Sequence, residues 1–348
     1  MSSTSSDKPL IRALAGECVA SPPIWLMRQA GRYLAEYRAI RRQAGSFLDL
    51  CYNPALAAAV TLQPVERFAM DGAILFSDIL VVPDALGAEV SFHEDEGPRL
   101  TPICDVAGLA RLDPQGITGH LGPVYETVER VAQGLPDGTA LIGFAGAPWT
   151  GATYMVEGGS SRDFAAAKSW ALSDPDGFQQ LIDLLVNASV EYLIGQIDHG
   201  VEAVQIFDSW AGVLPESEFQ RWCVAPARAM VEALRASCPT VPIIGFPRGV
   251  GVMARDYVSQ TGIDAIGIDS VMPVSWAAAE LQPDCTVQGN LDPICLLAGG
   301  DRMDTEINAI LEALGRGRFV FNLGHGIVPA TPPEHVARLV ETVRAWSP

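Results

Sequence analysis

Short apolar segments recur along the chain, and longer amphipathic segments separate them. The apolar segments cover residues 73–76, 140–144, 203–207, 241–246, 265–268, 286–288 and 319–322. The intervals between them show helical periodicity, most clearly at residues 177–199, 216–236 and 304–314. Apolar strands that alternate with helices are typical of parallel pairing, so the pattern predicts an α/β fold.

Two architectures fit this alternation, a closed eight-stranded barrel and an open doubly wound sheet. An eighth strand could lie at 24–27 or at 89–92. Open sheets that bind nucleotides usually carry G-x-G-x-x-G or G-x-x-x-x-G-K-[ST] after an early strand, and neither motif is found there. The sequence therefore predicts a single-domain (β/α)8 TIM barrel over residues 9–348. A disordered, Ser-rich tail is expected at residues 1–8, and an N-terminal extension of the barrel is expected to contribute to the active site.

Polar residues and glycines follow nearly every predicted strand. They are Ser77 and Asp78, residues 146–148, Asp208 and Ser209, residues 247 and 248, Asp269, Asn290 and residues 324–326. The active site of such a barrel lies where the strands end, so these positions are the first candidates for chemistry.

Composition narrows the functional classes. The 348 residues carry a net charge of -18, which disfavours nucleic acid and anionic membranes as partners. A mean hydropathy of +0.20 without any apolar run of membrane-spanning length, and an N-terminus unlike a signal peptide, predict a cytoplasmic protein. The seven cysteines include no C-x-x-C pair, so reduced thiols are expected.

One segment runs against this acidic composition. Residues 22–42 hold five arginines, and Glu36 is their only acid. Arg28 and Arg32 reach the same small volume whether the segment is helical or turns at Gly31, and two guanidinium forks suit a ligand with several carboxylates or phosphates. The alternative is an ordinary helix face with solvated or paired arginines. Lysine-dependent chemistry is disfavoured, because the only lysines are Lys8 in the tail and Lys168 on a predicted helix surface.

Five stretches carry a specific resemblance: MRQAGRYLAEYR, LQPVERFAMDGAILFSDILVVPDALG, GFAGAPWTGATYMVEGG, QIFDSWAG and FNLGHGI. Together they resemble the uroporphyrinogen decarboxylase family of haem and tetrapyrrole (porphyrin) biosynthesis, from about residue 9 to the C-terminus. The resemblance implies a carboxy-lyase that removes the four acetate carboxyls of uroporphyrinogen III, giving coproporphyrinogen III and four CO2. It also implies a (β/α)8 barrel, no cofactor or metal, and a cytoplasmic homodimer.

The same resemblance implies the site. Asp78 and Arg28 match catalytic positions, with Asp78 facing the pyrrole NH groups and Arg28 holding carboxylates and relaying a proton. The positions that match substrate contacts are Arg28, Gln29, Ala30, Gly31, Arg32, Asp78, Tyr154, Ser209 and His325. Taken from the residues alone, structural roles stay open: an N-cap or ion pair for Asp78, a satisfied tyrosine hydroxyl, a serine turn and a packed histidine.

The chemistry needs no cofactor. A pyrrole ring protonated at its α-carbon becomes an iminium that accepts the electrons of the breaking bond to CO2, so the substrate is its own electron sink. The alternative enzyme class is a cobalamin-linked, zinc-dependent methyltransferase, whose zinc site uses His-x-Cys; this chain has no His-x-Cys. A tetrapyrrole-binding carrier without catalysis is the third possibility.

Overall fold

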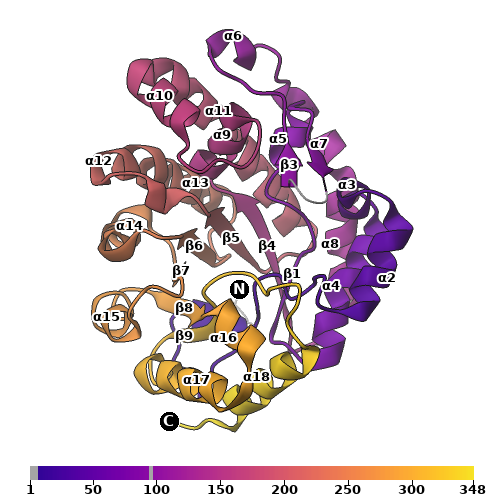
Figure 1. Cartoon of the computed structure of the whole chain (residues 1–348), viewed down its shortest axis with the longest axis vertical. Helices are drawn as coiled ribbons and strands as arrows, with labels where there is room; N and C mark the ends of the chain where they lie inside the picture. Colours follow the sequence, from indigo (N-terminus) through magenta and orange to yellow (C-terminus); the bar gives the residue numbers. More distant parts are fainter. Residues whose placement is uncertain (1–6, 94–96) are drawn as a thin grey trace.

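The computed structural model describes residues 7–93 and 97–348, and its centre is a curled sheet of parallel strands (Figure 1). Within these ranges the sheet has seven strands in the order β1-β4-β5-β6-β7-β8-β9. They are β1 (Gly72–Ile74), β4 (Ala140–Gly146), β5 (Ala203–Asp208), β6 (Ile243–Pro247), β7 (Ala265–Gly267), β8 (Thr286–Leu291) and β9 (Phe319–Leu323). Each predicted strand overlaps one of these seven, and every neighbouring pair is parallel, as predicted.

A short segment near the N-terminus bridges the gap between the last strand and the first. Ile24 forms a parallel bridge with Phe321 of β9, and the Phe321 amide donates to the Pro23 carbonyl at 2.9 Å. On the other side, the Asp71 amide donates to the Ile24 carbonyl at 2.9 Å, just before β1. We call residues 23–28 the closing segment, because its first residues close the ring. The predicted barrel is therefore confirmed, and the candidate at 24–27 takes the place of an eighth strand.

The other candidate for the eighth strand, at 89–92, is wrong. It overlaps β2 (Ser91–His93), which pairs antiparallel with β3 (Gly97–Arg99) in a separate two-stranded sheet. The two residues that lead into β2, Glu89 and Val90, follow Gly87, whose φ of +92° belongs to the left-handed region. The chain therefore turns away from the barrel after α5 (Val81–Ala85) and forms a hairpin.

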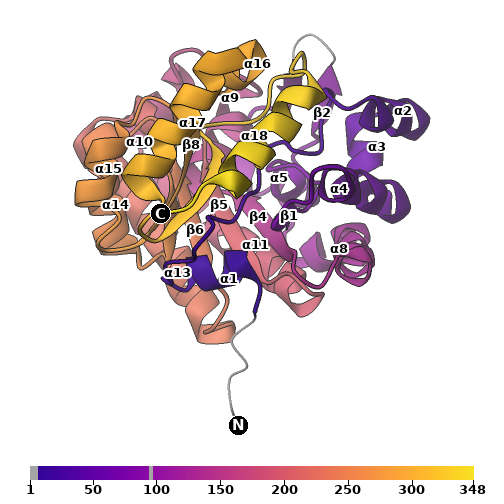
Figure 2. The ribbon, with the colours of Figure 1, turned by 90° about the horizontal axis from the view of Figure 1, so that it is seen from below.

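Helices surround the strands (Figures 1 and 2). The longer helices that follow the closing segment are α2 (Ala35–Ala44), α4 (Pro54–Phe68), α8 (Gly122–Gly134), α9 (Pro148–Glu157), α10 (Ala165–Ser173), α11 (Pro175–Asp198), α13 (Ala225–Ser237), α14 (Ala254–Thr261), α17 (Gly300–Leu314) and α18 (Pro333–Ala345). The shorter helices are α1 (Pro9–Leu14), which precedes the closing segment, and α3 (Phe47–Cys51), α6 (Val106–Leu109), α7 (Ile117–His120), α12 (Glu216–Phe219), α15 (Val274–Glu280) and α16 (Pro293–Ala298). A π-helical turn, Gln220–Val224, joins α12 to α13. The three predicted helices are thus confirmed in α11, in α12 with α13, and in α17.

Local sequence explains where the helices begin. Asn53 accepts a hydrogen bond from the Leu56 amide at 3.1 Å ahead of α4. Asp174 accepts one from the Gly177 amide at 3.0 Å ahead of α11. In both helices proline occupies the first turn, where its missing N–H is harmless.

Helix α1 packs under the barrel, at the end where the strands begin (Figure 2). Thr286 at the start of β8 donates to the Ala13 carbonyl of α1 at 2.7 Å. Lys8 forms an ion pair with Glu202, 2.6 Å away, ahead of β5. Of the predicted disordered tail at 1–8, residues 1–6 lie outside the described residues, whereas Lys8 has a defined partner.

A line of polar side chains crosses the barrel interior. The Trp25 indole N–H donates to Gln288 Oε1 at 2.8 Å, and Gln288 Nε2 donates to Gln205 Oε1 at 3.0 Å. All three residues are fully buried. Because a buried polar group needs a partner, these bonds fix Trp25 of the closing segment against β8 and β5.

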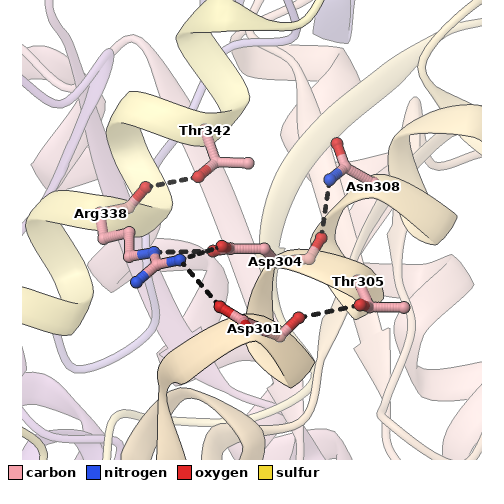
Figure 3. Close-up of polar contacts among 6 residues, drawn as sticks. All are labelled: Asp301, Asp304, Thr305, Asn308, Arg338 and Thr342. Carbon is pink, nitrogen blue, oxygen red and sulfur yellow. Dashed lines mark hydrogen bonds and ion pairs between the residues drawn. The ribbon is translucent and has the colours of Figure 1, made fainter.

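Exposed ion pairs join the last two helices on the outside. Arg338 of α18 contacts Asp304 of α17 through two of its nitrogens and lies 3.6 Å from Asp301 (Figure 3). Both aspartates belong to the first half of α17, so the contact aligns this part with α18.

Among the described residues, no helix is long and apolar enough to cross a membrane.

The closing segment depends on Asp71. Its Oδ2 accepts from the Ile24 amide and from Arg344 Nη2, each at 2.7 Å, and the residue is 9% exposed. Asp71→Ala should lower the free energy of unfolding by about 2–4 kcal/mol, because a buried amide loses its charged acceptor. A drop of several degrees in melting temperature measures this.

Asp301→Ala is the matched control, because its fully exposed carboxylate touches Arg338 only at 3.6 Å. Exposed ion pairs contribute little, so this variant should melt like the parent protein. Equal melting temperatures for both variants would contradict the structural role of Asp71.

Candidate active site

Asp78 lies in the turn between β1 and α5. Its Oδ1 accepts a hydrogen bond from the Leu80 amide at 2.9 Å, the local turn that aspartate favours before a helix. Asp78 Oδ2 accepts no hydrogen bond from any described residue. The structural role considered for Asp78 therefore occupies one oxygen and leaves the other available to a ligand.

The Asp78 carboxylate lies in an apolar environment. Burial raises the pKa of Asp78 to about 6, although the Leu80 amide and the charge of Arg28 act in the opposite direction. The following residues, Leu80 and Val81, are almost completely buried. Asp78 is thus an anion at neutral pH that water stabilises poorly.

Arg28, which follows the barrel-closing residues, acts on this carboxylate through its charge. Its φ of +60° is left-handed, which is uncommon for a residue with a side chain. The side chain passes over Gly326: a Cβ there would lie 2.3 Å from Arg28 Cδ. Arg28 forms no ion pair with a described residue, yet its charge acts on Asp78, Tyr154 and His325. The guanidinium therefore lies among the predicted site residues without a protein anion of its own.

The RQAGR segment is a turn, and helix α2 begins only at Ala35. The Gln29 amide donates to the Leu26 carbonyl at 2.9 Å, and the Leu34 amide donates to the Gly31 carbonyl at 3.0 Å. Of the two geometries considered for Arg28 and Arg32, the turn is correct. Arg32 is exposed, forms no ion pair within the described chain, and its charge acts on Tyr37 of α2.

The substrate contact predicted for Gln29 needs a correction. Gln29 is fully buried; its Oε1 accepts from the Leu26 amide at 3.0 Å and its Nε2 donates to the Gly72 carbonyl at 3.0 Å. Its own carbonyl accepts from the Tyr33 hydroxyl at 2.9 Å. Gln29 thus anchors the turn to β1. Its neighbours Ala30 and Gly31 are half-buried and provide no polar side chain.

Tyr154 lies on α9, the helix that follows β4. Burial raises the pKa of its hydroxyl, the negative charge of Asp78 acts in the same direction, and Arg28 acts against both. Its ring lies 6.2 Å from that of Trp210, and Trp210 lies 5.0 Å from Phe164. The half-buried Tyr154 hydroxyl therefore shares the electrostatic environment of Asp78 and Arg28.

Ser209 sits at the end of β5, in a loop that α9 holds in place. Trp149 Nε1 donates to the Trp210 carbonyl at 3.0 Å, and the Trp210 amide donates to Thr150 Oγ1 at 3.2 Å. The Thr150 hydroxyl donates to the buried carboxylate of Asp208 at 2.6 Å. Ser209 itself is half-buried and its hydroxyl makes no bond with a described residue.

His325 follows β9 between two glycines that the packing requires. A Cβ on Gly324 would lie 2.2 Å from Ser270 Oγ, and a Cβ on Gly326 would collide with the Arg28 side chain that passes over it. Burial, together with the smaller effects of the charges of Arg28 and Arg248, lowers the pKa of His325 to about 4. The imidazole is therefore neutral at physiological pH.

The structure gives roles to three residues that the family resemblance does not name, although Asp208 and Arg248 were already candidates because each follows a predicted strand. Asp208 and Thr150 hold the Ser209 loop, and Arg248 acts on His325. Arg248 directly follows a strand, and that position was the available signal. Among the described residues, no group of three or more histidine, cysteine or acidic side chains could hold a metal ion.

Comparison with known proteins identifies the family. The family model described as uroporphyrinogen decarboxylase matches residues 5–346. The chain belongs to the uroporphyrinogen decarboxylase family. It is 57% identical over 342 residues to the uroporphyrinogen decarboxylase of Rhodospirillum rubrum, covering 98% of both chains. It is 52% identical over 340 residues to that of Agrobacterium fabrum, again covering 98% of both. The predicted family and enzyme class, a carboxy-lyase of tetrapyrrole biosynthesis, are confirmed.

Solved structures support the fold of this uroporphyrinogen decarboxylase family member. A methyltransferase from Methanosarcina mazei superposes with a TM-score of 0.78 and 19% identity, covering 97% of each chain. A B12-independent methionine synthase from Shewanella sp. W3-18-1 superposes with a TM-score of 0.55 and 10% identity, covering 94% of each chain. At such low identity these likenesses show a shared fold only.

The environment of His325 leads to a prediction for NMR. The ring resonances should titrate with a pKa of about 4 in the parent protein. Arg28→Gln should raise that pKa toward the ordinary value of about 6.5, because the imidazolium loses a nearby positive charge. Arg228→Gln, at an exposed position of α13 whose charge does not act on His325, should leave the pKa unchanged. An ordinary pKa in the parent would show that the ring is neither buried nor close to Arg28.

Proposed function

We propose that the carboxyl end of this barrel binds uroporphyrinogen III and converts it to coproporphyrinogen III with release of four CO2. The observation that carries the proposal is the half-buried carboxylate of Asp78, on which the charge of Arg28 acts. Neither Arg28 nor Arg32 forms an ion pair with a described residue. The substrate has the complementary pattern, since its pyrrole N–H donors face the centre and its carboxylates lie at the rim. A site with a central anion and peripheral cations fits that pattern.

Each site residue then has a defined contact. Asp78 Oδ2 accepts from the central pyrrole N–H groups, while Oδ1 stays bound to Leu80. Arg28 and Arg32 bind acetate and propionate carboxylates, since a planar fork can hold both oxygens of one carboxylate. Tyr154, Ser209 and the neutral imidazole of His325 add hydrogen bonds to the polar groups at the rim.

The reaction proceeds at one pyrrole ring at a time. A proton adds to the α-carbon of the ring, and the resulting iminium accepts the electron pair of the bond between the acetate methylene and its carboxylate. CO2 leaves, the exocyclic methylene takes up a proton to become a methyl group, and the α-carbon loses its proton to restore the pyrrole. Each cycle consumes one proton and releases one CO2, without an external oxidant or reductant.

Asp78 stabilises the protonated ring more than the neutral ring, because only the protonated ring carries a positive charge. A fixed anion in an apolar environment stabilises such a charge far more strongly than it would in water. The raised pKa of Asp78, about 6, reflects the same poor solvation. The residue is therefore expected to act by its charge at neutral pH. A guanidinium is a very weak acid, so the structure supports Arg28 as a carboxylate anchor more than as a proton donor.

Asp78→Asn tests the charge directly. Asparagine keeps the size and one acceptor oxygen but removes the negative charge, so turnover should fall on the order of a hundredfold while the fold is retained. Asp78→Glu keeps the charge in a shifted position and should retain a measurable fraction. The assay is anaerobic incubation with uroporphyrinogen III, with products separated by carboxyl count.

Binding and melting measurements separate the alternatives. Substrate affinity should fall less than turnover if the charge acts mainly on the protonated ring. Near-normal turnover in Asp78→Asn would remove Asp78 from the mechanism. Binding of the tetrapyrrole by the parent protein without CO2 release would support the carrier hypothesis instead.

We further propose a homodimer that joins two active-site ends. Three exposed apolar residues follow the ends of neighbouring strands: Val252 in a 3-10 turn after β6, Val271 after β7 and Ile294 at the start of α16 after β8. They are 72%, 82% and 57% exposed, respectively. Because β6, β7 and β8 are adjacent in the sheet, these side chains lie on the same side of the barrel mouth. A second copy that covers this rim would bury them and shield the reacting carboxylates from water.

Val271→Asp should shift the protein from dimer to monomer, because it places a charge in an apolar contact. Light scattering coupled to gel filtration measures the mass. Leu172→Asp is the matched control: Leu172 is 68% exposed but lies on α10, away from the β6–β8 loops. A dimer that survives Val271→Asp and dissociates with Leu172→Asp would place the interface elsewhere.

We also propose that the enzyme works in the cytoplasm. All seven cysteines are free, including the three buried thiols of Cys51, Cys223 and Cys285. Burial raises the pKa of each of these three, so they are unreactive. Free cysteines fit a reducing compartment.

A further inference from the structure

Arg248 is held between two loops of the barrel mouth. It directly follows β6, and its amide donates to the Asp208 carbonyl at 3.1 Å while its carbonyl accepts from the Gly212 amide at 2.9 Å. The next amide, that of Gly249, donates to Asp269 Oδ2 at 2.6 Å. Backbone bonds therefore tie Arg248 to the loop that carries Ser209 and to the loop that follows β7.

The contact with the Gly212 loop is tightly packed. A Cβ on Gly212 would lie 2.4 Å from the Gly249 carbonyl oxygen, so the two backbones pack directly against each other. Gly249 also has a φ of +79°, in the region that favours glycine. The backbone of Arg248 is thus fixed in place before any ligand binds.

The guanidinium of Arg248 differs from those of comparable arginines. The other half-buried arginines in the described chain are Arg12, Arg41, Arg235 and Arg318, and each donates to a carboxylate or a carbonyl. Arg248 is half-buried too, but its guanidinium donates to no described residue. A partly desolvated cation without a partner is unfavourable unless an anion binds to it.

The charge of Arg248 faces the candidate active site. Together with Arg28 it lowers the pKa of His325, after the larger effect of burial. Arg28 approaches His325 from the closing segment, whereas Arg248 approaches it from β6. Two cations from opposite parts of the barrel wall therefore act on one imidazole.

We propose that Arg248 is a further substrate-binding residue, which holds one carboxylate at the rim of the macrocycle opposite the side held by Arg28 and Arg32. The proposal rests on the proposed substrate. Eight carboxylates exceed what two guanidinium forks can pair, so a third fork has a ligand available to it.

The test compares Arg248→Gln and Arg248→Lys with Arg228→Gln, an exposed arginine of α13 outside the site. Equilibrium binding of the octacarboxylic porphyrin uroporphyrin III is measured by fluorescence, and KM and kcat are measured with uroporphyrinogen III. Arg248→Gln should weaken binding and raise KM by about tenfold to a hundredfold, with a smaller effect on kcat, since one charge-assisted contact is lost. Arg248→Lys should lie in between, and Arg228→Gln should match the parent protein.

A second measurement locates the charge. The pKa of His325 should rise in Arg248→Gln and stay lower in Arg248→Lys, which keeps the positive charge. Unchanged binding and KM in Arg248→Gln would overturn the proposal. If that variant melts early, Arg248→Lys decides at an unchanged melting temperature: parent-like affinity would overturn the proposal, and severalfold weaker binding would support it.

The design separates this inference from the proposed function. A parent protein that binds uroporphyrin III but releases no CO2 would refute the proposed decarboxylation, while a loss of porphyrin binding in Arg248→Gln would still support the anchor. Conversely, normal decarboxylation with unchanged KM in Arg248→Gln would refute only the anchor.

Discussion

The closure of the barrel is the constraint on which the site depends. Residues 23–25 bridge β9 and the start of β1, and Arg28 follows three residues later in the same turn. The Met27 amide donates to Asn322 Oδ1 at 3.0 Å and its carbonyl accepts from the Ile327 amide at 2.9 Å, so the segment is also joined to the His325 loop. One stretch therefore completes the fold and delivers a cation to the site.

This coupling explains how opposite charges can be kept close without neutralising each other. Asp78 has one oxygen bound to a backbone amide, and Arg28 lies along Gly326 instead of forming an ion pair. Both groups are positioned by backbone contacts, so neither must give up a partner when a ligand arrives. Preorganised charges of this kind lose little energy to rearrangement during the reaction, which is why they are effective at stabilising a transient cation.

Periodicity was sufficient for the strands, because continuous apolar segments have few alternatives in an α/β protein. Asp78 and Ser209 became candidates for the same reason, since each comes just after such a segment. The sequence could not show that Gln29 faces inward while its neighbour Arg28 lies among the predicted site residues. That depends on the Gly72 carbonyl, a group 43 residues away that only the tertiary fold brings close. Arg248 was a candidate only through its position after a predicted strand, because its distinguishing feature, a half-buried guanidinium without a partner among the described residues, is a property of the folded chain.

The left-handed backbone of Arg28 shows how the fold supports this site. A residue with a side chain in that conformation is less stable by about 1–2 kcal/mol than in the right-handed region. The next residue, Gln29, makes hydrogen bonds with both side-chain groups, its amide and its carbonyl, and each is worth about 1 kcal/mol. Four such bonds exceed the strain of one residue. The buried glutamine therefore holds the arginine in a conformation that it would not adopt alone.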